Sequence, residues 1–390
     1  MKYNFDEIID RKNTNCEKYD DLIEIFGKED LIPMWVADTD FRTPDFIVEA
    51  IKKRADHEIY GYPMIPDSFY NSIQNWINTK HNWKIEKEWI SFSPNVVIGL
   101  ASTVLSLTRP GDKIIVQPPV YFPFFHVIKG NDRIIVENQL KVVNNHYEFD
   151  YDDLINKIDR NTKMLILCSP HNPGGRVWKK EELIKLGKIC LEKNIVIVSD
   201  EIHSDLIFSG IKHTPIASIS DEMANSCITL MSASKTFNIA GLSSSYVIVP
   251  NKELRSKFNY FINHNHFSGG NIFGLTATEA AYTHGQEWLQ MLIEYLEENL
   301  KIVTSFFSEH FPSVKVMVPE GSFLVWIDLS GIGIPIKDAI NKLIENGLAL
   351  SPGHIFGSGG ENFVRLNMGC PKSLLIKGLE VFKKTFHQLM

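Results

Sequence analysis

Excess basic charge and long apolar runs are both missing from this sequence. Its 390 residues hold 40 Lys and Arg against 47 Asp and Glu, a net charge of −7, with no basic block. Phosphate backbones need a concentrated basic surface, so we expect no nucleic-acid partner. No apolar run approaches the length of a membrane span, and residues 1–10 alternate charged and apolar side chains. We therefore expect no membrane partner, a cytoplasmic location and a small-molecule substrate.

Cysteine is scarce, and its spacing argues against a metal site. The five cysteines form an odd set without metal-ligand spacing, which fits reduced, mostly structural thiols. No repeat or low-complexity linker divides the chain. A content of 44% hydrophobic and 22% charged residues is typical of a globular protein, and the length suffices for one large domain plus a smaller one.

Short apolar runs alternate with amphipathic helical segments between about residues 85 and 285. The expected strands are Lys113–Val116, Arg133–Val136, Met164–Cys168, Ile195–Ser199, Ile228–Met231 and Tyr246–Val249, and one expected helix is Glu181–Lys193. This rhythm predicts an α/β fold with a mostly parallel sheet and crossover helices.

The last hundred residues follow a different pattern. A long helix is expected at about residues 286–309, strands at Val314–Val318, Phe323–Asp328 and Phe363–Asn367, and a second helix at Ile336–Asn346. This pattern predicts a smaller α+β domain.

The run from Ser232 to Leu242 contains the most informative residue, Lys235. The run closes an apolar segment beginning at Cys227, so Lys235 should follow a buried strand, where open α/β sheets bind ligands. Ser232, Ser234 and nearby N–H groups suit an anionic group, and a partly desolvated lysine is an imine-forming nucleophile. The combination suits pyridoxal phosphate, an aldehyde with a phosphate group. The alternative is that Lys235 is an ordinary solvated surface charge.

Other polar residues follow neighbouring strands. Asp200 comes directly after the expected strand Ile195–Ser199, where a carboxylate can pair with the pyridine nitrogen and keep it protonated; Asp is also a common helix N-cap. Asn172, in the turn after Met164–Cys168, is placed to bind the ring's phenolic oxygen, although Asn-Pro-Gly is otherwise an ordinary turn. His203 is a second candidate for that oxygen, and a single His is more often structural.

Phosphate, ring and carboxylate contacts have candidates of their own. Val96 and Val97 precede an expected helix at Ile98–Thr108, and free N–H groups at a helix start bind phosphate, although most such starts bind nothing. Tyr121 follows a Pro-Pro pair and suits stacking on an aromatic ring or simple packing. Arg365 lies in the last expected strand, where an inward Arg needs an anionic partner such as a substrate carboxylate.

Taken together, these residues resemble the pyridoxal-phosphate enzymes of the aspartate-aminotransferase fold (fold type I). Within them, the chain is most similar to the cystathionine β-lyase subgroup of bacterial C–S lyases, grouped with the class I/II aminotransferases. The motifs that carry the resemblance are MWVADTDF at 34–41, Gly61-Tyr62, residues 169–175 followed by Val177-Trp178, DEIH at 200–203, residues 232–242 and VRLNMGCP at 364–371. They occur in order over most of the chain.

The resemblance implies a domain division and a role for each site residue. The division is 1–49 for an N-terminal arm and part of the small domain, 50–285 for the large cofactor-binding domain, and 286–390 for the small C-terminal domain. Lys235 is the catalytic residue and carries the Schiff base, Asp200 faces the pyridine nitrogen, Asn172 and His203 hold the ring hydroxyl, and Tyr121 stacks on the ring beside the substrate. Val96, Val97, Ser232 and Ser234 surround the phosphate, Tyr62 arrives from the second subunit of a homodimer, and Arg365 takes the substrate α-carboxylate.

The chain also departs from the commoner pattern of this fold. Many aminotransferases carry an Arg eight residues after the lysine, where this chain has Ser243, and the difference favours the lyase subgroup. The turn reads Asn-Pro-Gly-Gly where Thr is common at the third place, and Asn95 stands where Gly is usual. The last two differences affect the details of the phosphate pocket.

The expected activity is therefore that of a pyridoxal-phosphate-dependent β-lyase. Its substrates would be cystathionine, cysteine or related thioether amino acids, and its products a thiol, pyruvate and ammonia. An aminotransferase shares every step up to the carbanion and is the closest alternative. A regulatory protein that keeps the cofactor as a structural or sensing ligand is the alternative from a different class.

Overall fold

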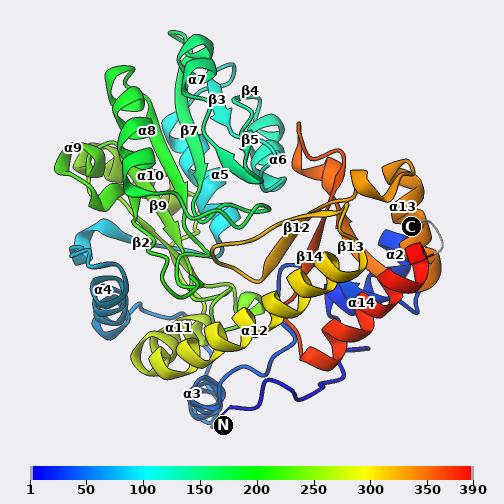
Figure 1. The fold of residues 1–390 in the computed structure, drawn as a ribbon. Coiled ribbons are helices and arrows are strands. Elements are labelled where there is room, and N and C mark those ends of the chain that lie inside the picture. The colour runs from blue at the N-terminus through cyan, green and yellow to red at the C-terminus, as the bar shows by residue number, and fades with distance from the viewer. Residues whose placement is uncertain (1–2, 388–390) are drawn as a thin grey trace.

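Two sheets organise the protein, whose computed structural model describes residues 3–387 (Figure 1). The larger sheet has seven strands in the order β2-β10-β9-β8-β7-β3-β4. Their bounds are β2 Ile90–Ser93, β10 Ser245–Ile248, β9 Cys227–Met231, β8 Val196–Asp200, β7 Thr162–Cys168, β3 Lys113–Val116 and β4 Ile134–Glu137. The strands from β9 to β4 run parallel, and β10 is antiparallel to both neighbours. The prediction of a mostly parallel sheet is confirmed.

Helices cover both faces of this sheet because successive residues of its central strands point in opposite directions. In β7, Met164 and Ile166 share a buried cluster with the helices of one face, whereas Leu165 and Leu167 join the cluster on the other. The first face is covered by α5 Val96–Leu107, α6 Pro123–Gly130 and α10 Lys252–His264, and the second by α8 Lys180–Glu192. Each such fully buried aliphatic side chain stabilises the fold by about 1.5–3 kcal/mol.

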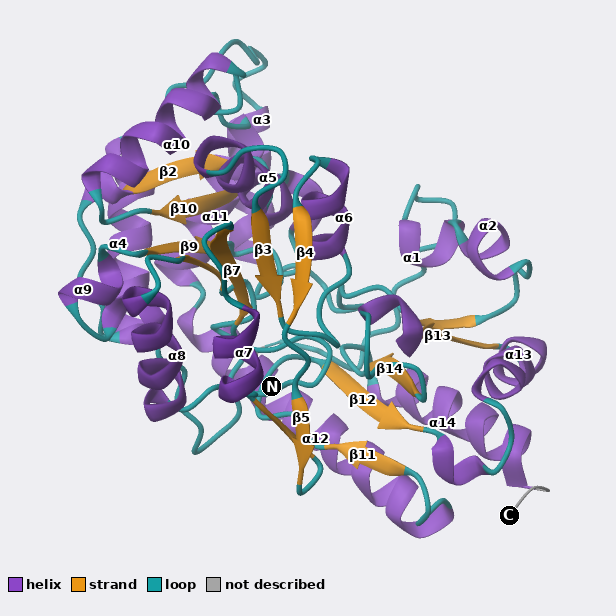
Figure 2. Ribbon diagram, turned by 90° about the horizontal axis from the view of Figure 1, so that it is seen from above, coloured by secondary structure: helices purple, strands orange, loops and turns teal. Residues whose placement is uncertain are grey.

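The smaller sheet has the order β1-β13-β14-β12-β11 and lies to one side of the larger one (Figure 2). Its elements are β1 Ile32–Met34, β13 Leu348–Pro352, β14 Phe363–Asn367, β12 Leu324–Asp328 and β11 Lys315–Met317, with helices α12 Gln286–His310, α13 Ile336–Asn346 and α14 Lys372–Phe386. The N-terminal strand β1 pairs parallel with β13, so residues before 50 complete a sheet otherwise built from the C-terminal part. The domain bounds stay a prediction.

The remaining elements connect or flank these two sheets. They are the helices α1 Glu17–Asp20, α2 Leu22–Phe26, α3 Asp45–Ala55, α4 Asp67–His81, α7 Tyr151–Lys157, α9 Asp221–Ala224 and α11 Ile272–His284, and the hairpin strands β5 Lys141–Val143 and β6 His146–Glu148. Within residues 3–387, no helix is long and apolar enough to cross a membrane.

The predicted elements agree with the structure apart from shifts at their ends. The strand at 113–116, the strand at 363–367 and the helix at 336–346 are confirmed to the residue. The helix expected from Ile98 begins two residues earlier, at Val96, because the Asn95 side chain accepts a hydrogen bond from Ile98 N and caps it. β13 was not predicted, since Leu348–Pro352 contains no β-branched residue.

Candidate active site

Asn172, Asp200 and Lys235 lie close together because the strands β7, β8 and β9 that precede or carry them are parallel neighbours. Cys168 of β7 is in register with Asp200 of β8, and Asp200 is in register with Leu230 of β9. The turns after these strands therefore open at one edge of the sheet. They surround a cavity of about 470 Å³. The predicted residues that line it are Val96, Val97, Tyr121, Asn172, Asp200, His203, Ser232, Ser234 and Lys235.

Lys235 presents its amine to this cavity. Its Nζ donates a hydrogen bond of 2.6 Å to the carbonyl oxygen of Ala37, in the segment that follows β1. Burial lowers the pKa of Lys235, while the charges of Asp38 and Asp200 oppose that shift. A lowered pKa increases the fraction of neutral amine, the form that attacks an aldehyde and accepts a proton.

Asp200 is 3% exposed at the base of the cavity. Its Oδ1 accepts a hydrogen bond of 3.1 Å from Ile202 N, and the chain continues into turns, so the alternative of a helix N-cap is wrong. Burial raises the pKa of Asp200 to about 7, partly offset by the Ile202 hydrogen bond and the charge of Lys235. A carboxylate in this position is stabilised as an anion by any cationic group placed beside it.

Arg365 on β14 is buried and surrounded by neutral acceptors. Its guanidinium donates to Asn172 Oδ1 at 3.1 Å, to the carbonyl oxygen of Trp35 at 2.7 Å and to Ser351 Oγ at 3.2 Å. Its Nε has no partner among residues 3–387, and no ion pair to it occurs there. Burial lowers the pKa of Arg365 to about 10. A buried guanidinium without a carboxylate partner is suited to an anionic ligand.

Tyr121 and His203 also line the cavity, Tyr121 with its aromatic ring and His203 with a neutral imidazole. Burial, followed by the charge of Asp200, raises the pKa of Tyr121 to about 12, so its hydroxyl stays protonated. Burial, with the positive charges of Lys235 and Arg365, lowers the pKa of His203 to about 3, so the ring is neutral. His203 Nδ1 is hydrogen-bonded to Ser322 Oγ at 3.2 Å, which fixes the ring's orientation.

The start of α5 supplies backbone donors to the cavity. Val96 and Val97 are its first two residues, and no acceptor for their N–H groups occurs within the described part of the chain, whereas the Ile98 N–H is held by Asn95. Ser232 Oγ donates to the Ser244 carbonyl oxygen and so braces the loop. Free helix N–H groups bind phosphate, and this donor set fits the phosphate expected from the sequence.

Some contributors to the cavity were missed by the sequence prediction. They are the carbonyl oxygen of Ala37, Ser244 and Glu17. Ala37 lies in the recognised motif at 34–41, but a backbone oxygen carries no residue-type signal. Tyr62, by contrast, was predicted at the site and lies outside the cavity of its own chain, with its side chain fully exposed. Its reach toward a second subunit stays a prediction.

Comparisons with known proteins agree with this geometry. Residues 29–382 match the family model described as aminotransferase class I and II. Cystathionine beta-lyase PatB of Bacillus subtilis (strain 168) is 44% identical over 382 residues, covering 97% of this chain and 99% of that protein. Cystalysin from Treponema denticola, whose structure contains pyridoxal 5'-phosphate, is 35% identical with a TM-score of 0.96, and each chain is covered completely. The pyridoxal-phosphate-bound C–S lyase from Staphylococcus hominis is 35% identical with a TM-score of 0.92 and 98% of each chain covered.

Proposed function

This chain belongs to the aminotransferase class I and II family, and from that premise we propose that it is a pyridoxal-phosphate-dependent C–S β-lyase. Its substrates are cystathionine, cysteine or related thioether amino acids, which it converts to a thiol, pyruvate and ammonia. The observation that carries the proposal is the cavity that brings Lys235 and Asp200 together with the helix start of α5, beside the buried Arg365.

Each residue of this cavity has a distinct task. Pyridoxal phosphate, when bound, supplies an electron sink that stabilises negative charge at the substrate Cα. Lys235 Nζ takes the Cα proton, which its lowered pKa allows. Arg365 binds the α-carboxylate and so orients the amino acid. Asp200 stabilises a cationic group of the bound ligand by placing a carboxylate beside it. Asn172 accepts a hydrogen bond from Arg365 and would hold the ring's phenolic oxygen, which would couple substrate orientation to cofactor position.

The choice of a lyase over an aminotransferase is supported by three observations. A relative that is 44% identical over nearly the whole chain is a cystathionine β-lyase, and a solved structure similar along the chain is a C–S lyase. The position that carries Arg in many aminotransferases of this fold is Ser243, which is exposed in the left-handed region at φ 48°. The phosphate would therefore be held by the α5 N–H groups and Ser234, together with Tyr62 of the second subunit.

One assay tests the proposed function directly. Purified holoenzyme is incubated with L-cystathionine without any keto acid, and pyruvate and free thiol are measured. We expect both products in equal amounts, because β-elimination needs no amino-group acceptor. Turnover only after addition of a keto acid would identify an aminotransferase, and bound cofactor without either reaction would favour a regulatory protein.

Arg365→Lys is expected to weaken amino-acid binding. Lysine keeps the positive charge but loses the planar fork that matches a carboxylate with two hydrogen bonds. We expect KM to rise roughly thirtyfold, or about 2 kcal/mol, with cofactor affinity unchanged. Steady-state kinetics and cofactor titration measure the two effects, and thermal unfolding serves as the stability control. An unaltered KM would remove Arg365 from the substrate site.

The proposal includes a cytoplasmic location and a homodimer with shared active sites. The dimer is supported by an exposed apolar stretch between α3 and α4. In this stretch, more than half of each side chain is exposed to solvent for Ile59, Tyr60, Tyr62 and Met64. Exposed apolar patches of this kind mark protein interfaces. In a symmetric dimer, Tyr62 of one subunit would extend to the phosphate side of the other cavity.

Shared sites predict complementation between two inactive variants. Tyr62→Ala removes the contact to the partner's cofactor, and Lys235→Ala removes the reacting amine. In a mixed dimer, one cavity carries both changes and the other carries neither. After the variants are unfolded and refolded together, we expect about a quarter of the parent activity per chain. No recovery, or sedimentation of a fully active monomer, would contradict the shared site.

A further inference from the structure

Glu17 stands at the mouth of the active-site cavity. Its side chain is exposed and also lines the cavity that contains Lys235, which places the carboxylate where the cavity meets solvent. Within residues 3–387, this carboxylate makes no hydrogen bond or ion pair. Its charge contributes to raising the pKa of both Tyr121 and Lys235, so it lies within electrostatic reach of the reacting groups.

The helix that carries Glu17 is held firmly to the site. In α1, the carbonyl oxygen of Lys18 accepts a 3.0 Å hydrogen bond from Trp35 Nε1, and Lys18 Nζ pairs with Asp40 at 2.7 Å. The carbonyl oxygen of Trp35 in turn accepts from Arg365 at 2.7 Å. Two hydrogen bonds through Trp35 thus join Arg365, the proposed carboxylate-binding residue, to Lys18, the neighbour of Glu17. These contacts fix the position of Glu17 relative to Arg365.

The cavity and its surroundings carry charges of both signs. Lys235 lines the cavity, Arg365 lies buried beside it with a hydrogen bond to the lining residue Asn172, and Asp200 is a buried lining residue. Asp38, the other nearby acid, is already paired with Arg11 at 2.6 Å. Glu17 is consequently an anion at the mouth of the cavity with no partner of its own in the described chain. An amino acid held at its α-carboxylate by Arg365 would contact Glu17 if its side chain extends past the sulfur toward this mouth.

We propose that Glu17 is a specificity-determining residue that binds an ammonium group on the leaving thiol. The inference rests on the proposed lyase function and narrows its substrate class to thioether amino acids whose leaving portion carries a cation. Cystathionine belongs to this class through the ammonium of its homocysteine half. A leaving portion that carries only a carboxylate is repelled by Glu17, and a neutral one is neither attracted nor repelled.

Three substrates that share an S–C–C skeleton and differ in the charge of its terminal group test this selectivity. They are S-(2-aminoethyl)-L-cysteine, S-ethyl-L-cysteine and S-carboxymethyl-L-cysteine. For Glu17→Gln, we expect the ratio of kcat/KM for the aminoethyl to the ethyl substrate to fall about fivefold, through KM, as for a single exposed ion pair. The ratio of carboxymethyl to ethyl substrate should rise. Glu24→Gln, an exposed acid of α2 outside the cavity, is the matched control and should keep both ratios.

A binding measurement separates this inference from the lyase activity itself. L-lysine, L-norleucine and L-2-aminoadipate have the same side-chain lengths with carbon in place of sulfur, so they cannot undergo C–S cleavage. Calorimetric titration of the holoenzyme should show lysine losing about fivefold in affinity relative to norleucine in Glu17→Gln, and aminoadipate gaining.

The outcomes distinguish the two proposals. If the parent enzyme forms pyruvate from thioethers but Glu17→Gln leaves the charge ratios of both experiments unchanged, the role of Glu17 is refuted and the lyase stands. If no thioether yields pyruvate, the lyase proposal fails, and the titration still decides whether Glu17 selects for a distal cation.

Discussion

Replacing Lys235 with alanine is expected to abolish turnover while the protein still folds. We expect kcat to fall at least about ten-thousandfold, because one amine serves as both the covalent partner of the cofactor aldehyde and the acceptor of the Cα proton. Among residues 3–387, no other lysine lines the cavity. The loss should not come from unfolding, since Lys235 faces an open cavity and its amine makes one hydrogen bond within the described part of the chain, to Ala37.

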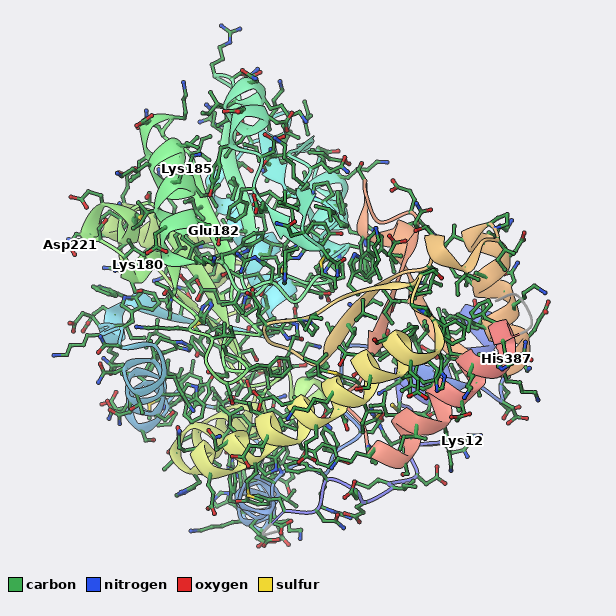
Figure 3. The ribbon with its side chains drawn as sticks, in the orientation of Figure 1. Lys12, Lys180, Glu182, Lys185, Asp221 and His387 are labelled. Carbon is green, nitrogen blue, oxygen red and sulfur yellow. The ribbon has the colours of Figure 1, made fainter. Side chains whose placement is uncertain are left out.

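Three measurements check this result. Pyruvate formation measures the rate, thermal unfolding compares stability, and absorbance after desalting shows whether the variant retains cofactor without the covalent link. Lys180→Ala is the matched control, because Lys180 is exposed at the start of α8 and lies at the edge of the molecule (Figure 3). In the parent enzyme, borohydride reduction and peptide mapping should label Lys235; a label on another lysine would overturn the site assignment.

The parts of the site that the sequence predicts are those set by local pattern. Asn172, Asp200 and Lys235 each follow a strand whose apolar run is visible in the sequence, and parallel pairing of β7, β8 and β9 brings them to one edge. Residues that follow successive parallel strands in the sequence are therefore close together in the structure. The apolar pattern of residues 363–367 likewise predicted β14, the strand that carries Arg365, to the residue.

The parts that could not be predicted depend on contacts between distant segments. Lys235 binds a carbonyl oxygen 198 residues away, and Arg365 binds one 330 residues away, at Trp35. Backbone oxygens are the same in every residue type, so composition and spacing contain no signal for them. The anionic partner expected for Arg365 is the substrate carboxylate, which stays a prediction, and the neutral acceptors that surround Arg365 in the protein carried no signal in the sequence. Glu17 reaches the cavity because α1 is anchored through Trp35 and through the Lys18–Asp40 pair.

Asp200→Asn is expected to leave a bound but nearly inert cofactor. Without the carboxylate, a positive charge on the pyridine nitrogen loses its partner, and the electron sink weakens. We expect kcat to fall about a hundredfold or more, the usual effect of deleting one preorganised electrostatic group. Asp221→Asn, an exposed acid that lies at the edge of the molecule on α9, is the matched control (Figure 3). Near-normal kcat with bound cofactor would reduce Asp200 to a cap of the turn at Ile202.

The pH dependence of protein stability provides a second, independent test of the role of Asp200. Burial raises its pKa from 3.8 to about 7, so between these values the folded cofactor-free protein binds a proton that the unfolded chain has released. Its free energy of unfolding should therefore fall as pH rises through this window, between pH 5 and pH 8 by about 3 kcal/mol more than in Asp200→Asn, which cannot ionise there. A cation bound beside the carboxylate lowers this pKa again, so saturating cofactor should remove the difference in pH dependence between parent and variant.

Chemical unfolding at pH 5 and pH 8, with and without cofactor, measures this pH dependence of stability. Equal slopes for parent and variant without cofactor would show that Asp200 is not an isolated buried acid, and a difference that persists with cofactor would show that no cation faces it.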